Sequence, residues 1–277
     1  MVTYSVCICN YNMAETLEES LRSVLDQVDE RFEVIVVDGG STDGSISILE
    51  RLDAEYEIFR FLALPPDDDR KLGMDRHISV KEARGEYVLL HIDCDDRFNE
   101  GIVNFAEVYR QIDQQVDFQF GMTGSHITIA PREFILEIGS YRNVQAAEDL
   151  DLWRRMMAED GFISLDCELF WEKIGYEKSY REKVRRILEM RTSEFQLGMS
   201  YWSRIRRAMQ HDRLSRGLFD VVVSTVAYGI AQTKEQYEMP DDMDKYEVYV
   251  RERKKRTMTL EEIEAKYGVD INKKTRI

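Results

Sequence analysis

The stretch YVLLHIDCDD, residues 87–96, passes from an apolar run directly into three aspartates within four positions. Its apolar part predicts a strand that is buried on both faces. Asp93, Asp95 and Asp96 repel one another when they are ionised this close together. They either hold a cation or are further acids in an acidic protein, and their position in the fold decides between these two interpretations.

Three earlier segments have the same character as this strand: residues 4–9, 32–37 and 57–64 are apolar and rich in β-favouring side chains. Apolar residues recur at helical spacing between the strands, and residues 73–84 form the last helix before the fourth strand. Alternating strands and helices predict a mainly parallel sheet with helices on both faces. The expected fold class is therefore α/β.

Polar clusters directly follow three of these strands. Asn10, Tyr11 and Asn12 follow the first strand, DGGSTDGS (38–45) follows the second, and DCDD (93–96) follows the fourth. The carboxyl ends of parallel strands lie along one edge of a sheet, where ligands collect. Acids that serve only as surface charge would instead be scattered over exposed helix faces. The three clusters are therefore expected to form one site.

Carboxylate oxygens at a strand end suit Mg²⁺ or Mn²⁺, which can bridge them to a diphosphate. We interpret Asp93, Asp95 and Asp96 as metal ligands, with Asp96 last, because Asp96 could instead cap a helix near Asn99. Phosphatases of the haloacid-dehalogenase type also carry DxD after a strand. That alternative is disfavoured because Asp96-Arg97 stand where those enzymes have Thr or Val.

Composition limits the classes of function. The net charge of −15 argues against nucleic-acid binding, which needs a basic surface. The chain has 26 Arg and only 12 Lys, and such acid-rich, lysine-poor sequences resemble proteins from salt-adapted microbes. The four cysteines form no CxxC pair and no secretion-type framework, so we expect reduced thiols in a cytoplasmic protein.

The composition changes near residue 170, which predicts a catalytic domain over residues 1–170 and a helical extension over 171–277. Residues 173–216 carry 12 Lys and Arg against 5 Asp and Glu, residues 217–233 are apolar apart from Asp220, and a charged tail follows. The segment 173–233 could lie on an anionic membrane face as a peripheral contact. The alternative is a helix pair that covers the core or forms a homo-oligomer.

No segment is a clear membrane span, and the N-terminus enters a strand without a signal peptide, so a cytoplasmic location is expected, with the cytoplasmic membrane face as the alternative. Glu148-Asp149 stand at a predicted helix N-terminus, where they either stabilise the helix dipole or supply a general base. Among the histidines, His91 is expected to be a hydrogen-bonded core residue. His126 could approach the site, but a structural role is favoured for it.

Four motifs taken together resemble one family. VCICNYN, VIVVDGGSTDGS, GEYVLLHIDCDD and AEDLDLWRR are similar, in order and spacing, to the motifs of family 2 glycosyltransferases, which are inverting sugar transferases of the GT-A fold. The resemblance covers residues 1–170. It implies a GT-A nucleotide-binding sheet, and it leaves the helical C-terminal extension without a matching motif.

The resemblance implies nucleotide-sugar-binding roles for Asn10, Tyr11, Asn12, Asp38, Asp43, Arg76 and Asp93. Tyr11 matches the tyrosine that lies against the base, and Asp38 matches an aspartate that contacts the base or ribose. The family usually has a second aspartate after the second strand, but this chain has Gly39, so the base preference is open. Arg76 matches a family arginine, whereas His77 replaces the asparagine that follows it.

The resemblance also assigns roles in the reaction. Asp93 and Asp95 match the metal and diphosphate motif, and Asp96 matches its common third acid. The resemblance ranks Asp95 first as a metal ligand, then Asp93, and Asp96 last. Asp149 matches the catalytic base, with Glu148 in support. The implied activity is Mg²⁺- or Mn²⁺-dependent transfer of a sugar from a UDP- or GDP-sugar to a glycan acceptor. A polyprenyl- or dolichyl-linked acceptor in glycoprotein or surface-polysaccharide assembly would suit membrane contact.

Two alternatives remain open at this point. One is a sugar-nucleotide-binding or scaffold protein whose catalytic site has decayed, although the aspartates at positions 93, 95 and 149 argue against it. The other is a nucleotidyltransferase, which would need a glycine-rich, basic first loop. The stretch NYNMAE after the first strand is neither.

Overall fold

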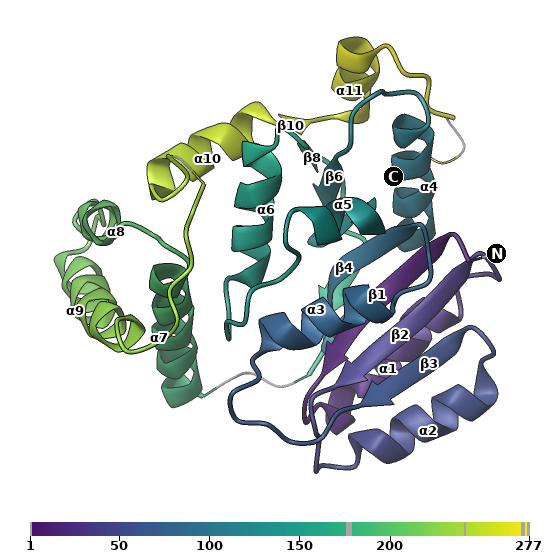
Figure 1. The fold of residues 1–277 in the computed structure, drawn as a ribbon, viewed down its shortest axis with the longest axis horizontal. Coiled ribbons are helices and arrows are strands. Elements are labelled where there is room, and N and C mark those ends of the chain that lie inside the picture. Colours follow the sequence, from purple (N-terminus) through teal and green to yellow (C-terminus); the bar gives the residue numbers. More distant parts are fainter. Residues whose placement is uncertain (1, 176–178, 241, 273–274, 276–277) are drawn as a thin grey trace.

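The computed structural model describes residues 2–175, 179–240, 242–272 and 275. Its centre is an eight-stranded sheet with the strand order β10-β8-β6-β7-β4-β1-β2-β3 (Figure 1). All neighbouring pairs are parallel except those that β7 makes with β4 and β6. The strands are β1 (Tyr4–Asn10), β2 (Phe32–Asp38), β3 (Phe59–Ala63), β4 (Tyr87–Asp93), β6 (Gly121–Gly124), β7 (Ile127–Pro131), β8 (Phe162–Leu165) and β10 (Thr257–Met258).

Helices cover both faces of this sheet, which confirms the predicted fold class. Side chains alternate between the faces along each strand, so Val34 and Val36 of β2 pack with one layer of helices and Ile35 packs with the other. The first layer contains α1 (Ala14–Leu25), α2 (Ser45–Glu55), α4 (Gly101–Asp113) and α11 (Leu260–Tyr267). The second contains α3 (Leu72–Glu82), α5 (Arg132–Glu137), α6 (Glu148–Ala158) and α10 (Tyr246–Lys255).

A bulge in β4 shifts the carboxyl end of this strand by one residue relative to β1. The pairing of β1 with β4 shifts register opposite His91, whose φ is 65°. The His91 ring is buried. Its Nδ1 is hydrogen-bonded to the Thr128 hydroxyl at 3.0 Å, and its Nε2 to the Tyr141 hydroxyl at 2.8 Å. The expectation that His91 is a hydrogen-bonded core residue is confirmed. As a result Asp93 lies level with Cys9, one residue before the end of β1.

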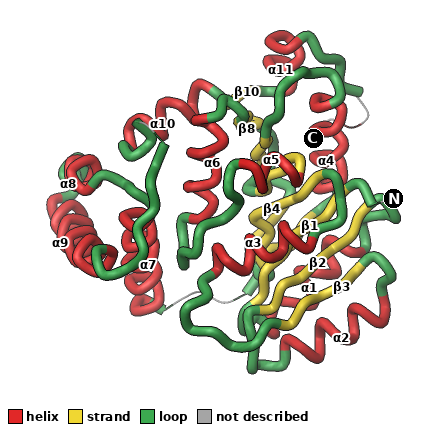
Figure 2. The backbone as a smooth tube through the Cα atoms, in the orientation of Figure 1, coloured by secondary structure: helices red, strands yellow, loops and turns green. Residues whose placement is uncertain are grey.

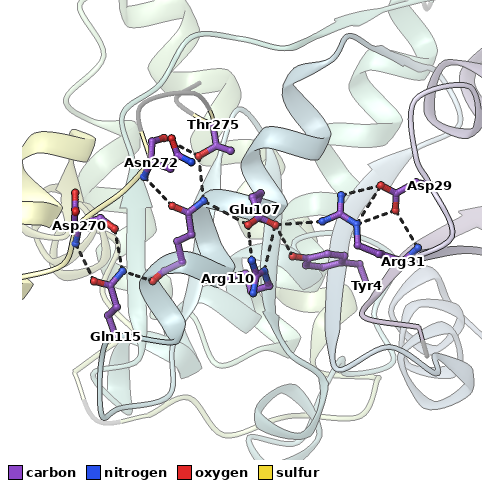
Figure 3. A network of polar contacts seen from close by, with 10 residues as sticks. Tyr4, Asp29, Arg31, Glu107, Arg110, Gln115, Asp270, Asn272 and Thr275 are labelled. Atoms are coloured by element: carbon purple, nitrogen blue, oxygen red, sulfur yellow. Dashed lines mark hydrogen bonds and ion pairs between the residues drawn. The ribbon is translucent and has the colours of Figure 1, made fainter.

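The C-terminal tail returns to the sheet. β10 pairs with β8 at the edge of the sheet, and Leu260 and Ile263 are buried in the core beside α4. Figure 3 shows the polar contacts between α4 and the tail, where the Asp270 amide donates to Gln115 at 3.0 Å. The division at residue 170 stays a prediction, but strand β10 from beyond it completes the sheet. The tail is rich in charged residues, so its few buried apolar residues form no pattern that predicts a place in the core.

A lobe of three helices lies beside the sheet (Figures 1 and 2). It contains α7 (Tyr180–Gln196), α8 (Tyr201–Ala208) and α9 (Leu214–Ala231). By length and composition, α9 is the one helix of the described chain that could cross a membrane, although 33% of it is buried in the protein. Helix α9 begins at Leu214, three residues before the apolar segment that the sequence predicted at 217–233.

The two faces of α9 have the reverse of the usual polarity. The buried face carries small or polar residues, including Ser224 and Asp220, and the Asp220 carboxylate pairs with buried Arg204 at 2.8 Å. The outer face exposes apolar side chains, among them Val222 at 60% and Val226 at 50%. A helix that only covers a soluble core has its apolar stripe inward. This outer face therefore requires a separate explanation.

If the tail is part of the folded core, Ile263→Ala will lower the free energy of unfolding by about 2–5 kcal/mol, because it opens a cavity at a fully buried position. Val226→Ala, on the exposed face of α9, should change it by less than about 0.5 kcal/mol. Urea unfolding followed by circular dichroism measures both. Equal effects of the two substitutions would show that the tail contributes nothing to the core.

Candidate functional site

The loop after β2 is held by buried hydrogen bonds. The Asp38 carboxylate accepts from the backbone amides of Gly40 at 3.0 Å and Ser41 at 2.8 Å, and from the Asn10 side-chain amide at 2.6 Å. Asp38 is fully buried and Asn10 nearly so. Both predicted site residues therefore support the loop from below, and their contact with a nucleotide sugar stays a prediction.

The loop after β1 is tied to the same turn. Asn12 donates its backbone amide to the Ser41 hydroxyl at 2.8 Å and accepts from the Thr42 amide at 2.8 Å. Asp43 accepts from the amide of Ala14 at 2.8 Å, at the start of α1. These bonds leave Tyr11, 62% exposed, as an aromatic surface above the carboxyl edge of the sheet.

The acidic cluster surrounds a lysine from a distant part of the chain. The short antiparallel sheet of β5 (Asp96–Phe98) and β9 (Trp171–Lys173) places Lys173 opposite Asp96. The Lys173 ammonium lies 2.6 Å from Asp95, 3.0 Å from Asp96 and 3.9 Å from Asp93. The alternative in which Asp96 caps a helix is wrong, because α4 begins after Glu100 and Asp96 belongs to a strand.

The residues at this edge fit a divalent cation. One oxygen each from Asp93 and Asp96 and one nitrogen of His126 lie within 4.8 Å of one another. One oxygen of Asp96 pairs with Lys173, whereas the other, Oδ2, is buried without a hydrogen-bond partner and could accept a further positive charge. The two carboxylates suit Mg²⁺ or Mn²⁺, and the imidazole is a ligand that a transition metal such as Mn²⁺ accepts more readily than Mg²⁺ does. In this structure Asp93 and Asp96 lie with His126, whereas the expected order of metal ligands put Asp95 first and Asp96 last. Asp95 as the first ligand stays a prediction.

A buried arginine joins the acidic cluster to the second acidic motif. Arg76 of α3 donates to Asp93 at 2.9 Å and to Glu148, the first residue of α6, at 3.0 Å. Burial raises the pKa of the Glu148 carboxyl to about 7, and neighbouring Asp149 adds to this rise while Arg76 opposes it. The predicted residues Arg76, Asp93 and Glu148 are therefore brought together.

Asp149 stands next to this ion pair with its carboxylate accessible. Ala147 adopts a φ of 59°, which turns the chain so that α6 begins at Glu148. Asp149 is half-buried, and within the described chain its side chain accepts one hydrogen bond, from the Leu150 amide at 2.7 Å. Lone pairs thus remain available to accept a proton.

Two side chains at this edge were not among the predicted site residues. Lys173 was assigned only to a basic segment, and for His126 a structural role was favoured over an approach to the site, yet both lie against the aspartates after β4. His126 reaches them from the two-residue turn between β6 and β7, where Ser125 and His126 both have positive φ. A two-residue turn after a strand was the only local signal for His126.

Comparisons with known proteins find similar sequences over the N-terminal part of the chain. Residues 5–128 match the model of glycosyl transferase family 2. The cholesterol galactosyltransferase of Borreliella burgdorferi is 36% identical over 92 residues, which cover 33% of this chain and 25% of that protein. The match therefore spans a quarter of the relative's own length.

Solved structures share the fold. TarS 1–349 of S. aureus, in complex with UDP-GlcNAc, superposes with a TM-score of 0.56 at 17% identity, covering 84% of this chain and 74% of that one. The mannosyltransferase PcManGT from Pyrobaculum calidifontis, in complex with GDP-Man and Mn²⁺, gives a TM-score of 0.56 at 16% identity and covers 84% and 76%. At these identities the likeness establishes the fold alone.

Removing the bridging guanidinium should destabilise the whole edge. Arg76→Ala leaves Glu148 buried without its ion-pair partner, so the free energy of unfolding is expected to fall by about 3–5 kcal/mol. Arg97→Ala breaks an exposed ion pair with Glu172 and should cost less than about 1 kcal/mol. Guanidinium unfolding curves compare the two, and similar losses would contradict a structural role for the Arg76 bridge.

Proposed function

Residues 5–128 match the model of glycosyl transferase family 2, and from this match we propose that the protein transfers a sugar, with inversion, from a nucleotide-diphosphate sugar to an acceptor hydroxyl. The observation that carries the proposal is the Arg76 bridge between Asp93 and Glu148. It puts the acidic cluster and the adjacent Asp149 on one edge of the sheet.

The donor binds over the carboxyl ends of β1, β2 and β4. Tyr11 supports the base, and the loop held by Asn10, Asp38 and Asp43 closes one side of the nucleotide site. Arg76 and Lys173 lie beside the acidic cluster, where the diphosphate would be. Their positive charges would offset the negative charge that develops on the leaving diphosphate.

The cation at this edge would be held by Asp93 and Asp96 with His126, and by Asp95 if Lys173 moves aside. A bound Mg²⁺ or Mn²⁺ supplies Lewis-acid stabilisation of the leaving diphosphate. The relevant property of the chain is that its buried Asp96 oxygen lacks a partner. The proposal of metal dependence rests on that atom and on the donor set.

Asp149 acts as the general base. Its carboxylate accepts the proton of the acceptor hydroxyl while that oxygen attacks the anomeric carbon from the face opposite the diphosphate. A single displacement inverts the configuration at that carbon. Glu148 does not exchange the proton, because it is buried against Arg76, and it holds the first turn of α6 in place.

The acceptor class follows from the outer face of α9. This face exposes Leu218, Val222 and Val226, while the N-cap residue Arg213 and Arg216, in the first turn of the helix, are exposed arginines. Apolar side chains beside arginines suit a helix that lies in the surface of an anionic membrane. A second copy of the chain is the less suitable occupant, because it would bring two basic surfaces together. We therefore propose a lipid-linked glycan as the acceptor.

Asp149→Asn should keep the donor dissociation constant within about twofold and slow donor hydrolysis by about 10²–10⁴-fold, because the amide cannot accept a proton in the transition state. Hydrolysis of UDP- and GDP-sugars with Mn²⁺, followed by phosphate-coupled assay and calorimetry, separates the two quantities. Glu133→Gln, at an exposed position on α5, is the control. Unchanged turnover in Asp149→Asn would remove its role as base.

Flotation with vesicles tests the membrane contact. The wild-type protein should float with phosphatidylglycerol vesicles, less at high salt, and should not float with phosphatidylcholine vesicles. Val222→Asp/Val226→Asp should abolish flotation, whereas Leu169→Asp, at a loop position that is 71% exposed, should not. A lipid-independent dimer that the α9 double substitution dissociates would instead assign this face to self-association.

A further inference from the structure

The Asp75 carboxylate lies near the Gly39 loop and Tyr11, and it takes no part in the proposed metal site or the proposed proton transfer. Asp75, in the first turn of α3, is 8% exposed. One of its oxygens, Oδ1, accepts from the Arg70 guanidinium at 2.7 Å. The same guanidinium donates to the carbonyl of Gly39 at 3.0 Å. In the described chain no group donates to the other oxygen, Oδ2.

The position of Oδ2 is fixed relative to the loop after β2. A Cβ atom built on Gly39 would lie 2.9 Å from Asp75 Oδ2 and 3.5 Å from the ring of Tyr11. The Asp75 carboxylate therefore occupies the place into which a side chain at position 39 would project. This carboxylate oxygen and the Tyr11 ring thus both border the space above Gly39.

This arrangement combines an aromatic face with a fixed hydrogen-bond acceptor. A base stacked on Tyr11 would turn its Watson–Crick edge toward a side chain at the ring's margin. An ionised carboxylate only accepts hydrogen bonds, so it suits the N3–H of uracil and the N–H groups of guanine. Cytosine and adenine carry an amino donor at that edge, but a ring nitrogen acceptor replaces the N3–H of uracil and would face the carboxylate unfavourably.

The hydrogen bonds of Asp75 distinguish between uracil and guanine. Arg70 engages Oδ1, which leaves Oδ2 for an incoming donor. Uracil offers a single N–H, whereas guanine offers two adjacent donors that a carboxylate pairs with most effectively when both of its oxygens face the base. We infer that Asp75 reads the N3–H of a uridine nucleotide and sets the donor specificity of the site, an inference that rests on the proposed function.

Calorimetric titration with nucleoside diphosphates and Mn²⁺ tests this role. Wild-type protein should bind UDP about tenfold to a hundredfold more tightly than N3-methyl-UDP, which lacks the donor, and than CDP. In Asp75→Asn the gap between UDP and N3-methyl-UDP should close, and CDP should gain affinity because the amide can donate to its ring nitrogen. Asp67→Asn, which changes the other carboxylate near Arg70, should keep the wild-type preference.

A rescue variant guards against a merely structural effect. Asp75→Ala should lose the preference for UDP, and Gly39→Asp added to it should restore the preference, because the new carboxylate enters the space that Asp75 vacates. Equal binding of UDP and N3-methyl-UDP by the wild-type protein would overturn the role of Asp75 alone. Failure of every nucleoside diphosphate to bind would overturn the proposed function together with it.

Discussion

The arrangement of the site depends on one buried arginine side chain. Arg76 is 5% exposed and bridges Asp93, at the end of β4, to Glu148, at the start of α6. Burying charges is costly unless each has a partner, so neither acidic motif could occupy this position without the guanidinium. The bridge also fixes α3 against both motifs. The distance between the acidic cluster and Asp149 is thereby set by a structural ion pair.

The same principle of paired charge recurs along the edge of the sheet. Lys173 lies among the aspartates after β4, and Arg70 holds Asp75 beside the nucleotide loop. Each basic side chain comes from outside the acidic motif that it neutralises. A nucleotide diphosphate and a divalent cation would add both signs of charge to this edge. Most of the charged side chains at this edge are therefore held in place by ion pairs before a ligand binds.

Local patterns in the sequence were sufficient to predict the sheet and its polar edge. The strands ending near Asn10, Asp38 and Asp93 are uniform apolar runs, and their polar ends meet because parallel strands share a direction. Contacts between distant segments could not be predicted in this way. Lys173 meets Asp96 only because β9 pairs with β5, and no periodicity in either segment records that pairing. The place of β10 in the sheet was missed for the same reason.

The most direct test of a nucleotide-diphosphate site at this edge is a crystal structure of the protein with Mn²⁺ and UDP, using the anomalous signal of manganese. The account predicts a manganese peak within bonding distance of Asp93 and Asp96, with the diphosphate on its open side and the uracil ring against Tyr11. A manganese peak elsewhere, or nucleotide density away from the carboxyl ends of β1 and β4, would contradict it.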